Sequence, residues 1–179
     1  MLHEETSLLV VIDIQGNLAR AAADRELLFE STRKLIQGAK VFSIPILVTE
    51  QIPEKLGPTI PEVAELLEGI IRIPKETFSC CDNAAFMETF NKANRKQILL
   101  CGIESHICVY QTAMDLLHMD CEIHIVADAV SSRTAQNREI GISKMVSAGA
   151  HLTSTETVLF ELLKTAGSDK FKDIFRIVK

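Results

Sequence analysis

The sequence predicts an α/β fold: a three-layer α-β-α domain on a doubly wound, six-stranded, mostly parallel sheet of Rossmann-like type. Two observations lead to this prediction. Short apolar runs alternate with longer segments of helical periodicity, and the runs are apolar at successive positions, as strands covered on both faces require. A length of 179 residues suits one core, so we expect residues 1–179 to form a single domain.

The first predicted strand, residues 8–12, is a continuous apolar run that ends at Asp13. Five further runs have the same character, although some are shorter. These predicted strands cover residues 44–48, 70–73, 98–101, 121–126 and 150–152. Strands separated by helical segments indicate parallel pairing, because a parallel pair needs a long crossover connection.

Segments with an apolar residue every three or four positions lie between these strands and predict helices. They cover residues 25–42, 83–93, 106–118, 136–148, 155–163 and 170–177. Asp82 is a suitable N-cap for the second of these helices, and Gly149 a suitable C-terminal stop for the fourth. Residues 51–61 contain three prolines and a glycine, which predicts a surface loop that could cover a site.

Composition argues against several classes of protein. The formal net charge of −5 disfavours a nucleic-acid binder, which needs a basic stripe to neutralise phosphates. No apolar run reaches the roughly 18 residues of a membrane span, and the acidic start lacks the features of a signal peptide. Five scattered cysteines indicate free thiols in a reducing compartment. We therefore expect a cytoplasmic protein with no membrane or nucleic-acid partner.

Two polar residues stand where predicted strands end, which is where open parallel sheets bind ligands. Asp13 directly follows five apolar residues, so its carboxylate is partly desolvated and suited to proton transfer. Lys75 follows the third predicted strand. Each also has a plain structural interpretation: Asp13 as a cap or ion-pair partner, and Lys75 as a solvated loop residue.

Cys108 lies near the start of the helix that follows the fourth predicted strand. Gly102 permits a sharp turn there, and Ser105 is a possible N-cap. In the first helical turn, the helix dipole would stabilise a thiolate, and unpaired N–H groups could hold an oxyanion. The alternative is a small buried thiol, and the residues alone leave both interpretations open.

Four segments together resemble one known family. They are VVIDIQ (residues 10–15), KETFS (75–79), GIESHICVYQTA (102–113) and VADAVSSR (126–133). In this order they are similar to the isochorismatase-like cysteine hydrolases, a superfamily that includes nicotinamidases and N-carbamoylsarcosine amidohydrolases. Within it, the branch of isochorismatase domain-containing proteins matches best. The similarity covers nearly the whole chain.

The resemblance implies roles for named residues. The family's Asp-Lys-Cys triad carries over to Asp13, Lys75 and Cys108. A cis peptide before the nucleophile maps to the Ile103–Glu104 bond, with the N–H groups of Glu104 and Cys108 as the oxyanion hole. The implied substrate-pocket residues are Gln15, Leu18, Phe78 and His106. His106 is expected to face substrate rather than act as the base, because it stands two residues before Cys108 on a predicted helix.

The chain departs from the metal-binding members of the superfamily. Nicotinamidases hold a metal through an Asp and several His after the second strand, whereas residues 48–53 here contain no His. The five histidines lie elsewhere without ligand spacing, so we expect no metal and no cofactor. Enzymes that act on isochorismate itself typically lack the Cys, so its presence favours amide-type hydrolysis.

We therefore expect a cysteine hydrolase that cleaves a C–N bond of a small molecule through a thioester, and that forms a dimer or larger homo-oligomer. One alternative is a catalytically silent binding or scaffold protein of the same fold. A nucleotide-binding oxidoreductase is disfavoured because no G-x-G-x-x-G follows the first strand.

Overall fold

The computed structural model describes residues 1–179, and at its centre lies one six-stranded sheet. The strands are β1 (Ser7–Ile12), β2 (Ile46–Gln51), β3 (Arg72–Lys75), β4 (Gln97–Ile103), β5 (Glu122–Ser131) and β6 (His151–Thr153). Their order across the sheet is β3-β2-β1-β4-β5-β6, and every pair is parallel. The predicted fold class is confirmed.

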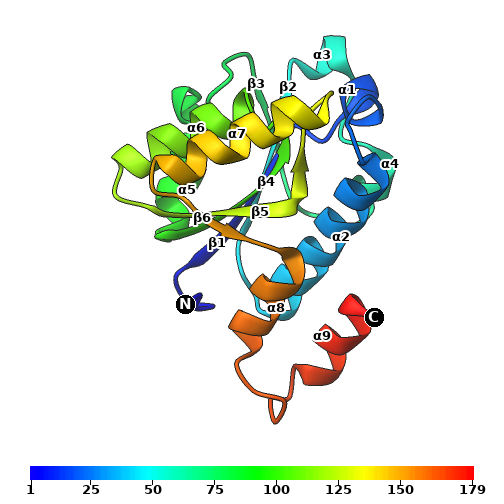
Figure 1. Ribbon diagram of the computed structural model, residues 1–179, viewed down its shortest axis with the longest axis vertical. Helices are drawn as coiled ribbons and strands as arrows, with labels where there is room; N and C mark the ends of the chain where they lie inside the picture. The colour runs from blue at the N-terminus through cyan, green and yellow to red at the C-terminus, as the bar shows by residue number, and fades with distance from the viewer.

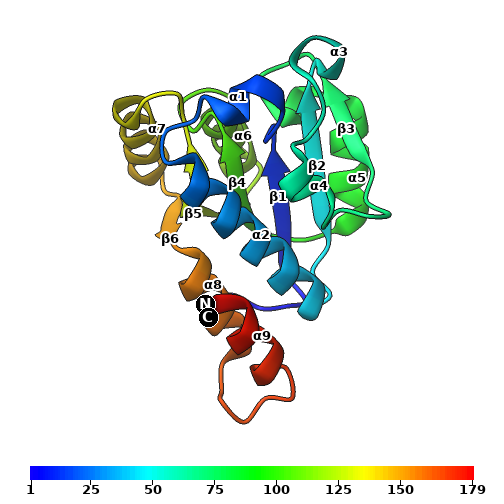
Figure 2. The same ribbon diagram turned by 90° about the vertical axis from the view of Figure 1, so that its right-hand side faces the viewer.

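Helices cover both faces of the sheet (Figures 1 and 2). The long helices are α2 (Arg25–Val41), α5 (Ala84–Ala93), α6 (Cys108–His118), α7 (Ala135–Ser147), α8 (Thr155–Leu163) and α9 (Phe171–Val178). Short helices are α1 (Gly16–Arg20), α3 (Pro53–Leu56), α4 (Pro61–Ala64) and the 3₁₀ turn η1 (Cys80–Asp82). Helices α2, α8 and α9 form one layer, and α5, α6 and α7 form the other (Figure 1).

The two faces of the central strand belong to two separate hydrophobic clusters. Leu9 and Val11 of β1 pack in a cluster with α2, α8 and α9, whereas Leu8 and Val10 pack with α5, α6 and α7. Successive side chains of a strand point to opposite faces, so a strand between two helical layers must be apolar throughout. This explains the uninterrupted apolar run that the sequence displays.

The order of the strands reverses at β1. The chain passes from β1 outward to β2 and β3, and then returns to place β4 on the other side of β1. The connections leaving β1 and β4 therefore diverge, and the crevice beyond their carboxyl ends is the expected ligand site of such a sheet. The turn from β1 to α1 and the turn from β4 to α6 meet at this place (Figure 2).

Several boundaries differ from the prediction. Strand β2 begins two residues later and continues through Gln51, because its polar end pairs with both β1 and β3. Strand β5 continues through Ser131, with a register shift opposite residues 100–102 of β4. The helices α1, α3 and α4 are too short to carry a periodic signal, and the last two lie in or beside the predicted loop. No helix has both the length and the apolar character that a bilayer crossing requires.

Candidate active site

The three residues of the predicted triad stand at the carboxyl ends of β1, β3 and β4. Asp13 directly follows β1, Lys75 is the last residue of β3, and Cys108 is the first residue of α6. All three are buried. Asp13 has a φ of 53°, a left-handed conformation that Asp tolerates better than most residues and that turns the chain sharply after β1.

Asp13 and Lys75 form a buried ion pair. The Lys75 Nζ atom lies 2.7 Å from Asp13 Oδ2, and both side chains are fully inaccessible to solvent. Asp13 Oδ1 accepts a second bond, of 2.7 Å, from the hydroxyl of Thr49 on β2. The two carboxylate oxygens therefore have different partners, one cationic and one neutral.

The ammonium group of Lys75 has acceptors on all sides. Besides its ion pair with Asp13, it donates to Gln51 Oε1 at 2.6 Å and to the carbonyl oxygens of Thr77 and Phe78 at 3.1 and 3.3 Å. Burial lowers the pKa of Lys75, but the negative charge of Asp13, and then the ionised forms of Cys108 and Cys80, outweigh it and keep the pKa above its ordinary value. Three N–H donors facing four acceptors leave no proton free for a ligand, so Lys75 acts here as a fixed positive charge.

The surroundings of Cys108 disfavour the thiolate relative to a free thiol. Burial, followed by the negative charge of Asp13 and a hydrogen bond to it, raises the pKa of Cys108 to about 12, although the charge of Lys75 opposes the shift. The stabilising effect expected of the helix start stays a prediction, and burial and the Asp13 carboxylate act against it. The helix dipole is a modest, partial charge, whereas desolvation and a full carboxylate charge act directly on the sulfur.

A second thiol lies in the same environment. Cys80 is buried, and its Sγ atom lies 3.9 Å from Thr49 Oγ1, the hydroxyl that also binds Asp13. Burial raises the pKa of Cys80 to about 11, with Lys75 opposing this shift. Nothing in the sequence distinguished Cys80 from a core thiol, because its proximity to Asp13 depends on tertiary packing. All five cysteines are free.

The turn between β4 and α6 leaves three N–H groups unpaired, and those of Glu104 and Cys108 are the two expected oxyanion donors. The Ile103–Glu104 peptide bond is cis. The N–H groups of Ser105, Ile107 and Val109 donate to backbone oxygens, whereas those of Glu104, His106 and Cys108 have no hydrogen-bond acceptor in the protein. Two unpaired donors beside a nucleophile are the arrangement that stabilises an oxyanion.

Glycines allow this turn to approach its neighbours closely. Gly102 has a φ of 124°, and a Cβ atom at this position would lie 2.0 Å from the carbonyl oxygen of Ile12. Gly141 of α7 lies behind the turn, where a Cβ atom would be 2.5 Å from the carbonyl oxygen of Ser105 and 2.7 Å from the nitrogen of His106. No side chain fits at either position without displacing backbone.

The predicted N-cap role of Ser105 is wrong. Helix α6 begins at Cys108 with Ile107 as its N-cap, which has no side chain able to cap. Ser105 Oγ instead lies 2.8 Å from Ser132 Oγ and donates to the carbonyl oxygen of Arg138. The Ser132 hydroxyl also lies 2.9 Å from His106 Nδ1. The free N–H groups of the first helical turn are thus left uncapped, and the serine hydroxyls fasten the turn to α7 and the end of β5.

The carboxylate of Glu104 is bonded to Arg133. Its Oε1 atom accepts bonds of 3.0 Å from both the backbone N–H and the Nε of Arg133. Arg133 itself is exposed. Because the Glu104 carboxylate is neutralised in this way, it does not impose a repulsive charge on an acidic substrate.

The predicted pocket residues occupy different environments. Gln15 is fully buried and all of its side-chain contacts are with backbone: Nε2 donates to the carbonyls of Gln51 and Gly57, and Oε1 accepts from the Gln51 N–H. It fastens the 52–60 loop to β2. Leu18 and His106 are half-buried, and Phe78 is 54% exposed, next to the carbonyl that binds Lys75.

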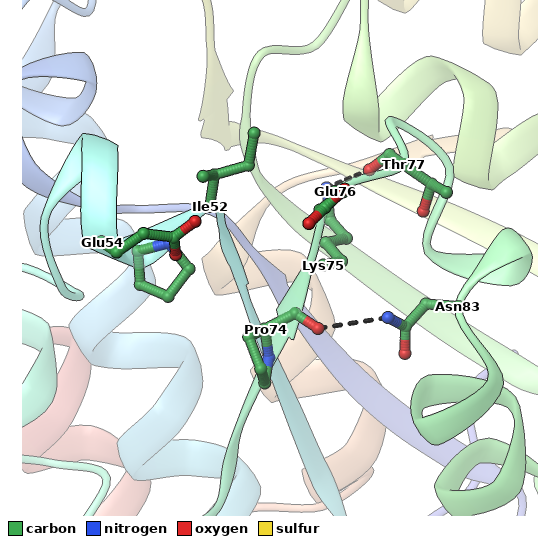
Figure 3. A pocket seen from close by; sticks show the side chains of 8 residues that line it. Ile52, Glu54, Pro74, Lys75, Glu76, Thr77 and Asn83 are labelled. Carbon is green, nitrogen blue, oxygen red and sulfur yellow. Dashed lines mark hydrogen bonds between the residues drawn. The ribbon is translucent and has the colours of Figure 1, made fainter.

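A cavity of about 340 Å³ lies on the outer side of Lys75. Its lining comes from the loop after β2, the end of β3 and the residue before α5. Figure 3 shows the hydrogen bond that the Asn83 side chain donates to the Pro74 carbonyl oxygen. Neither Asp13 nor Cys108 lines it. The acidic Glu54 and Glu76 line it together with Lys75, whose ammonium is paired with Asp13.

The side chains present do not fit a metal centre. No group of three or more His, Cys, Asp or Glu residues is arranged to hold a metal ion. At the end of β2, where metal-binding members of the superfamily resembled by this chain place ligands, Gln51 uses both ends of its amide on Lys75 and the Glu76 carbonyl. That position therefore has no free ligand to offer.

Known proteins resemble this chain over most of its length. A family model described as the isochorismatase domain matches residues 7–157. Isochorismatase domain-containing protein 2A of Mus musculus is 35% identical over 175 residues, which cover 98% of this chain and 84% of the mouse protein. The secreted isochorismatase effector Isc1 of Phytophthora sojae is 35% identical, covering 99% of this chain and 87% of its own.

Solved structures have the same fold. MAR1 ribonuclease from Caenorhabditis elegans superposes with a TM-score of 0.93 at 35% identity, covering 99% of this chain and 91% of that one. YcaC from Escherichia coli, described as an octameric hydrolase of unknown specificity, superposes with a TM-score of 0.92 at 21% identity, covering 98% and 89%.

Proposed function

The chain belongs to the isochorismatase family, and on that premise we propose that it hydrolyses a C–N bond of a small amide or carbamoyl compound through a thioester on Cys108. One observation carries the proposal: a buried carboxylate–ammonium pair lies against the thiol of a residue whose own N–H group is unpaired. These are the parts of nucleophilic acyl transfer, namely a base, a nucleophile and an oxyanion donor.

In the first half of the reaction, Asp13 takes the proton of the Cys108 thiol as the sulfur attacks the substrate carbonyl. The negative charge moves from the carboxylate to the carbonyl oxygen, which the N–H groups of Glu104 and Cys108 hold. Asp13 then gives its proton to the departing nitrogen. The C–N bond breaks, the amine or ammonia leaves, and a thioester remains on Cys108.

In the second half, water replaces the amine. Asp13 accepts a proton from the water as the oxygen attacks the thioester carbonyl, and it returns that proton to the Cys108 sulfur as the C–S bond breaks. The acid product leaves, and the thiol and the carboxylate are regenerated. The high pKa of Cys108 suits this sequence, because the sulfur carries negative charge only during attack and departure.

Lys75 serves as a fixed charge in both halves. Its positive charge lowers the cost of placing negative charge on sulfur, as its opposing effect on the pKa of Cys108 indicates. Because the base, the nucleophile and the oxyanion donors all come from the chain, the proposed reaction requires no metal and no cofactor. We propose further that the protein acts in the cytoplasm on a small molecule, as a homo-oligomer of the kind described for YcaC.

A ribonuclease activity has less support from this chain. The name of the C. elegans protein assigns it to that protein, and the net charge of −5 here does not favour RNA binding. The alternative worth testing is a silent binding or scaffold protein, which would keep the fold without turnover.

The experiment is a screen of amides, ureides and carbamoyl compounds for release of ammonia or amine, made with the wild type, Cys108→Ser and Cys121→Ser. Cys121 is also a buried thiol, but it directly precedes β5 and so lies at the amino-terminal ends of the strands, away from the site. Cys121→Ser is therefore the matched control. We expect turnover by the wild type and the control and loss of turnover in Cys108→Ser. Full turnover by Cys108→Ser contradicts the assignment, and no turnover by any of the three favours the scaffold.

A further inference from the structure

Strand β2 lies between the two strands that carry the ion pair. β1, which Asp13 directly follows, pairs with one edge of β2, and β3, which ends at Lys75, pairs with the other. In this register Thr49 stands opposite Ile12, and Gln51 stands opposite Lys75. Residues two apart on a strand share a face, so Thr49 and Gln51 both face the ion pair.

Each of these two side chains binds one member of the pair. Thr49 Oγ1 donates to Asp13 Oδ1 at 2.7 Å, and Gln51 Oε1 accepts from Lys75 Nζ at 2.6 Å. Both residues are buried, and both are neutral. We propose that Thr49 and Gln51 are positioning residues that hold Asp13 and Lys75 in the geometry and charge state required by Cys108. This inference rests on the proposed function, because it assigns the two residues a part in the same site.

The orientation of the Gln51 amide is fixed by its surroundings. Its Nε2 atom donates to the Glu76 carbonyl at 2.7 Å, which obliges Oε1 to face the ammonium of Lys75. The backbone of Gln51 is held in turn by both ends of the Gln15 side chain. A chain of fixed groups thus runs from Gln15 through Gln51 to Lys75.

The chemistry of the two contacts favours the charged forms of both partners. A hydroxyl that donates to a carboxylate stabilises the anion, and an amide oxygen that accepts from an ammonium stabilises the cation. Without the Thr49 hydroxyl, the charge of Asp13 is less compensated and acts more strongly on the neighbouring sulfur. Without the Gln51 oxygen, the buried ammonium loses an acceptor, so its positive charge is less well maintained. Both changes disfavour a thiolate at Cys108.

The test therefore measures the thiolate directly, without a substrate. Iodoacetamide reacts with thiolate, and mass spectrometry of the Cys108 peptide gives its alkylation rate at each pH between 7 and 10. We expect Thr49→Val and Gln51→Leu each to slow alkylation of Cys108 about 3- to 10-fold at a given pH, equivalent to moving the profile upward by about half a pH unit to one unit. Thr49→Ser keeps the hydroxyl and is expected to restore the wild-type profile.

Two controls separate positioning from general destabilisation. Thr32 is a buried threonine of α2 whose hydroxyl has no hydrogen-bond partner, so Thr32→Val is matched to Thr49→Val. Gln97 is a buried glutamine at the first residue of β4, so it lies at the amino-terminal ends of the strands, away from the site. Gln97→Leu is therefore matched to Gln51→Leu. A merely structural role predicts that Thr49→Val and Gln51→Leu keep the wild-type alkylation profile, as the two control variants do, whatever their melting temperatures, and this result would overturn the proposal.

The outcome is distinguishable from failure of the proposed function. If the wild type hydrolyses no compound in the screen but the two site variants shift the alkylation profile, the hydrolase assignment fails and the positioning role stands. If the wild type turns over substrate and the profiles coincide, the positioning role fails alone. Where a substrate is found, we expect kcat to fall by up to about 100-fold in the site variants, as for small misplacements of reacting groups.

Discussion

The ammonium of Lys75 lies 2.7 Å from the carboxylate of Asp13, and neither side chain is accessible to solvent. Removing one partner of such a pair leaves an uncompensated buried charge, which typically costs about 3–5 kcal/mol, whereas removing both leaves none. We expect Asp13→Asn and Lys75→Met each to lower the free energy of unfolding by an amount of this order. The double variant is expected to recover part of the loss, and urea denaturation measures all three. Strict additivity would show that the two charges do not interact.

Asp13→Asn is expected to separate the reactivity of Cys108 from turnover. The charge of Asp13 and its hydrogen bond help to raise the pKa of the Cys108 thiol, so their removal lowers that pKa. Alkylation of Cys108 by iodoacetamide at pH 7–8 should therefore be faster in Asp13→Asn than in the wild type. Hydrolysis should be lost, because no group remains to carry the proton to the departing nitrogen. Slower alkylation in this variant would contradict the role given to Asp13.

The buried thiols predict a loss of stability at alkaline pH. Burial raises the pKa of Cys80 to about 11 and that of Cys101 well above its ordinary value of 9.0. A thiol whose pKa is higher in the folded state stabilises fully below its unfolded pKa, and the contribution is lost as the pH rises through the folded pKa. We therefore expect the free energy of unfolding to fall above about pH 9, by about 1.4 kcal/mol per pH unit for each buried thiol.

Cys101→Ala isolates one of these contributions. The variant is less stable at every pH because it loses buried volume. Between pH 9 and 11, however, its free energy of unfolding should fall less steeply, by about 1.4 kcal/mol per pH unit, which corresponds to one titrating proton. Chemical denaturation at several pH values under reducing conditions gives the slope. An unchanged slope would show that Cys101 does not titrate differently in the folded and unfolded states.

Much of this fold was predictable from the sequence because its signal is local. The apolar run of residues 8–12 is continuous since β1 is covered on both faces, and its last residue, Ile12, directly precedes Asp13. The end of β2 was not predictable in the same way. Thr49 and Gln51 are polar, and they belong to the strand because β1 and β3 pair with it and because the ion pair takes up their side chains.

The candidate site was predictable only in part. Position and family resemblance placed Asp13, Lys75 and Cys108 at strand ends, but the charge state of Cys108 depends on burial and on the carboxylate beside it, which the sequence does not display. Gln15 fits a pocket position by resemblance, yet its amide is bonded to the backbone of Gln51 and Gly57. Hydrogen bonds between residues about 40 positions apart have no sequence signal.

Helix α7 approaches the turn before Cys108 closely at Gly141. At Gly141 a Cβ atom would meet the carbonyl oxygen of Ser105 at 2.5 Å and the nitrogen of His106 at 2.7 Å, and backbone cannot move aside as a flexible side chain can. Gly141→Ala should therefore shift the turn that carries the proposed oxyanion donors of Glu104 and Cys108. A displacement of about 1 Å lowers turnover by about 100-fold, even though alanine favours the helix by about 1 kcal/mol.

Gly38→Ala is the matched control for this prediction. Gly38 is also a buried helical glycine, but the atom that a Cβ would meet there is the flexible end of the Leu159 side chain, far from the turn in the other helical layer. We expect both variants to lose stability in thermal unfolding and only Gly141→Ala to lose turnover out of proportion to stability. Equal effects of the two substitutions on turnover would contradict this prediction. They would mean that an added methyl group in either helical layer affects the site equally, so that α7 does not determine the position of the turn.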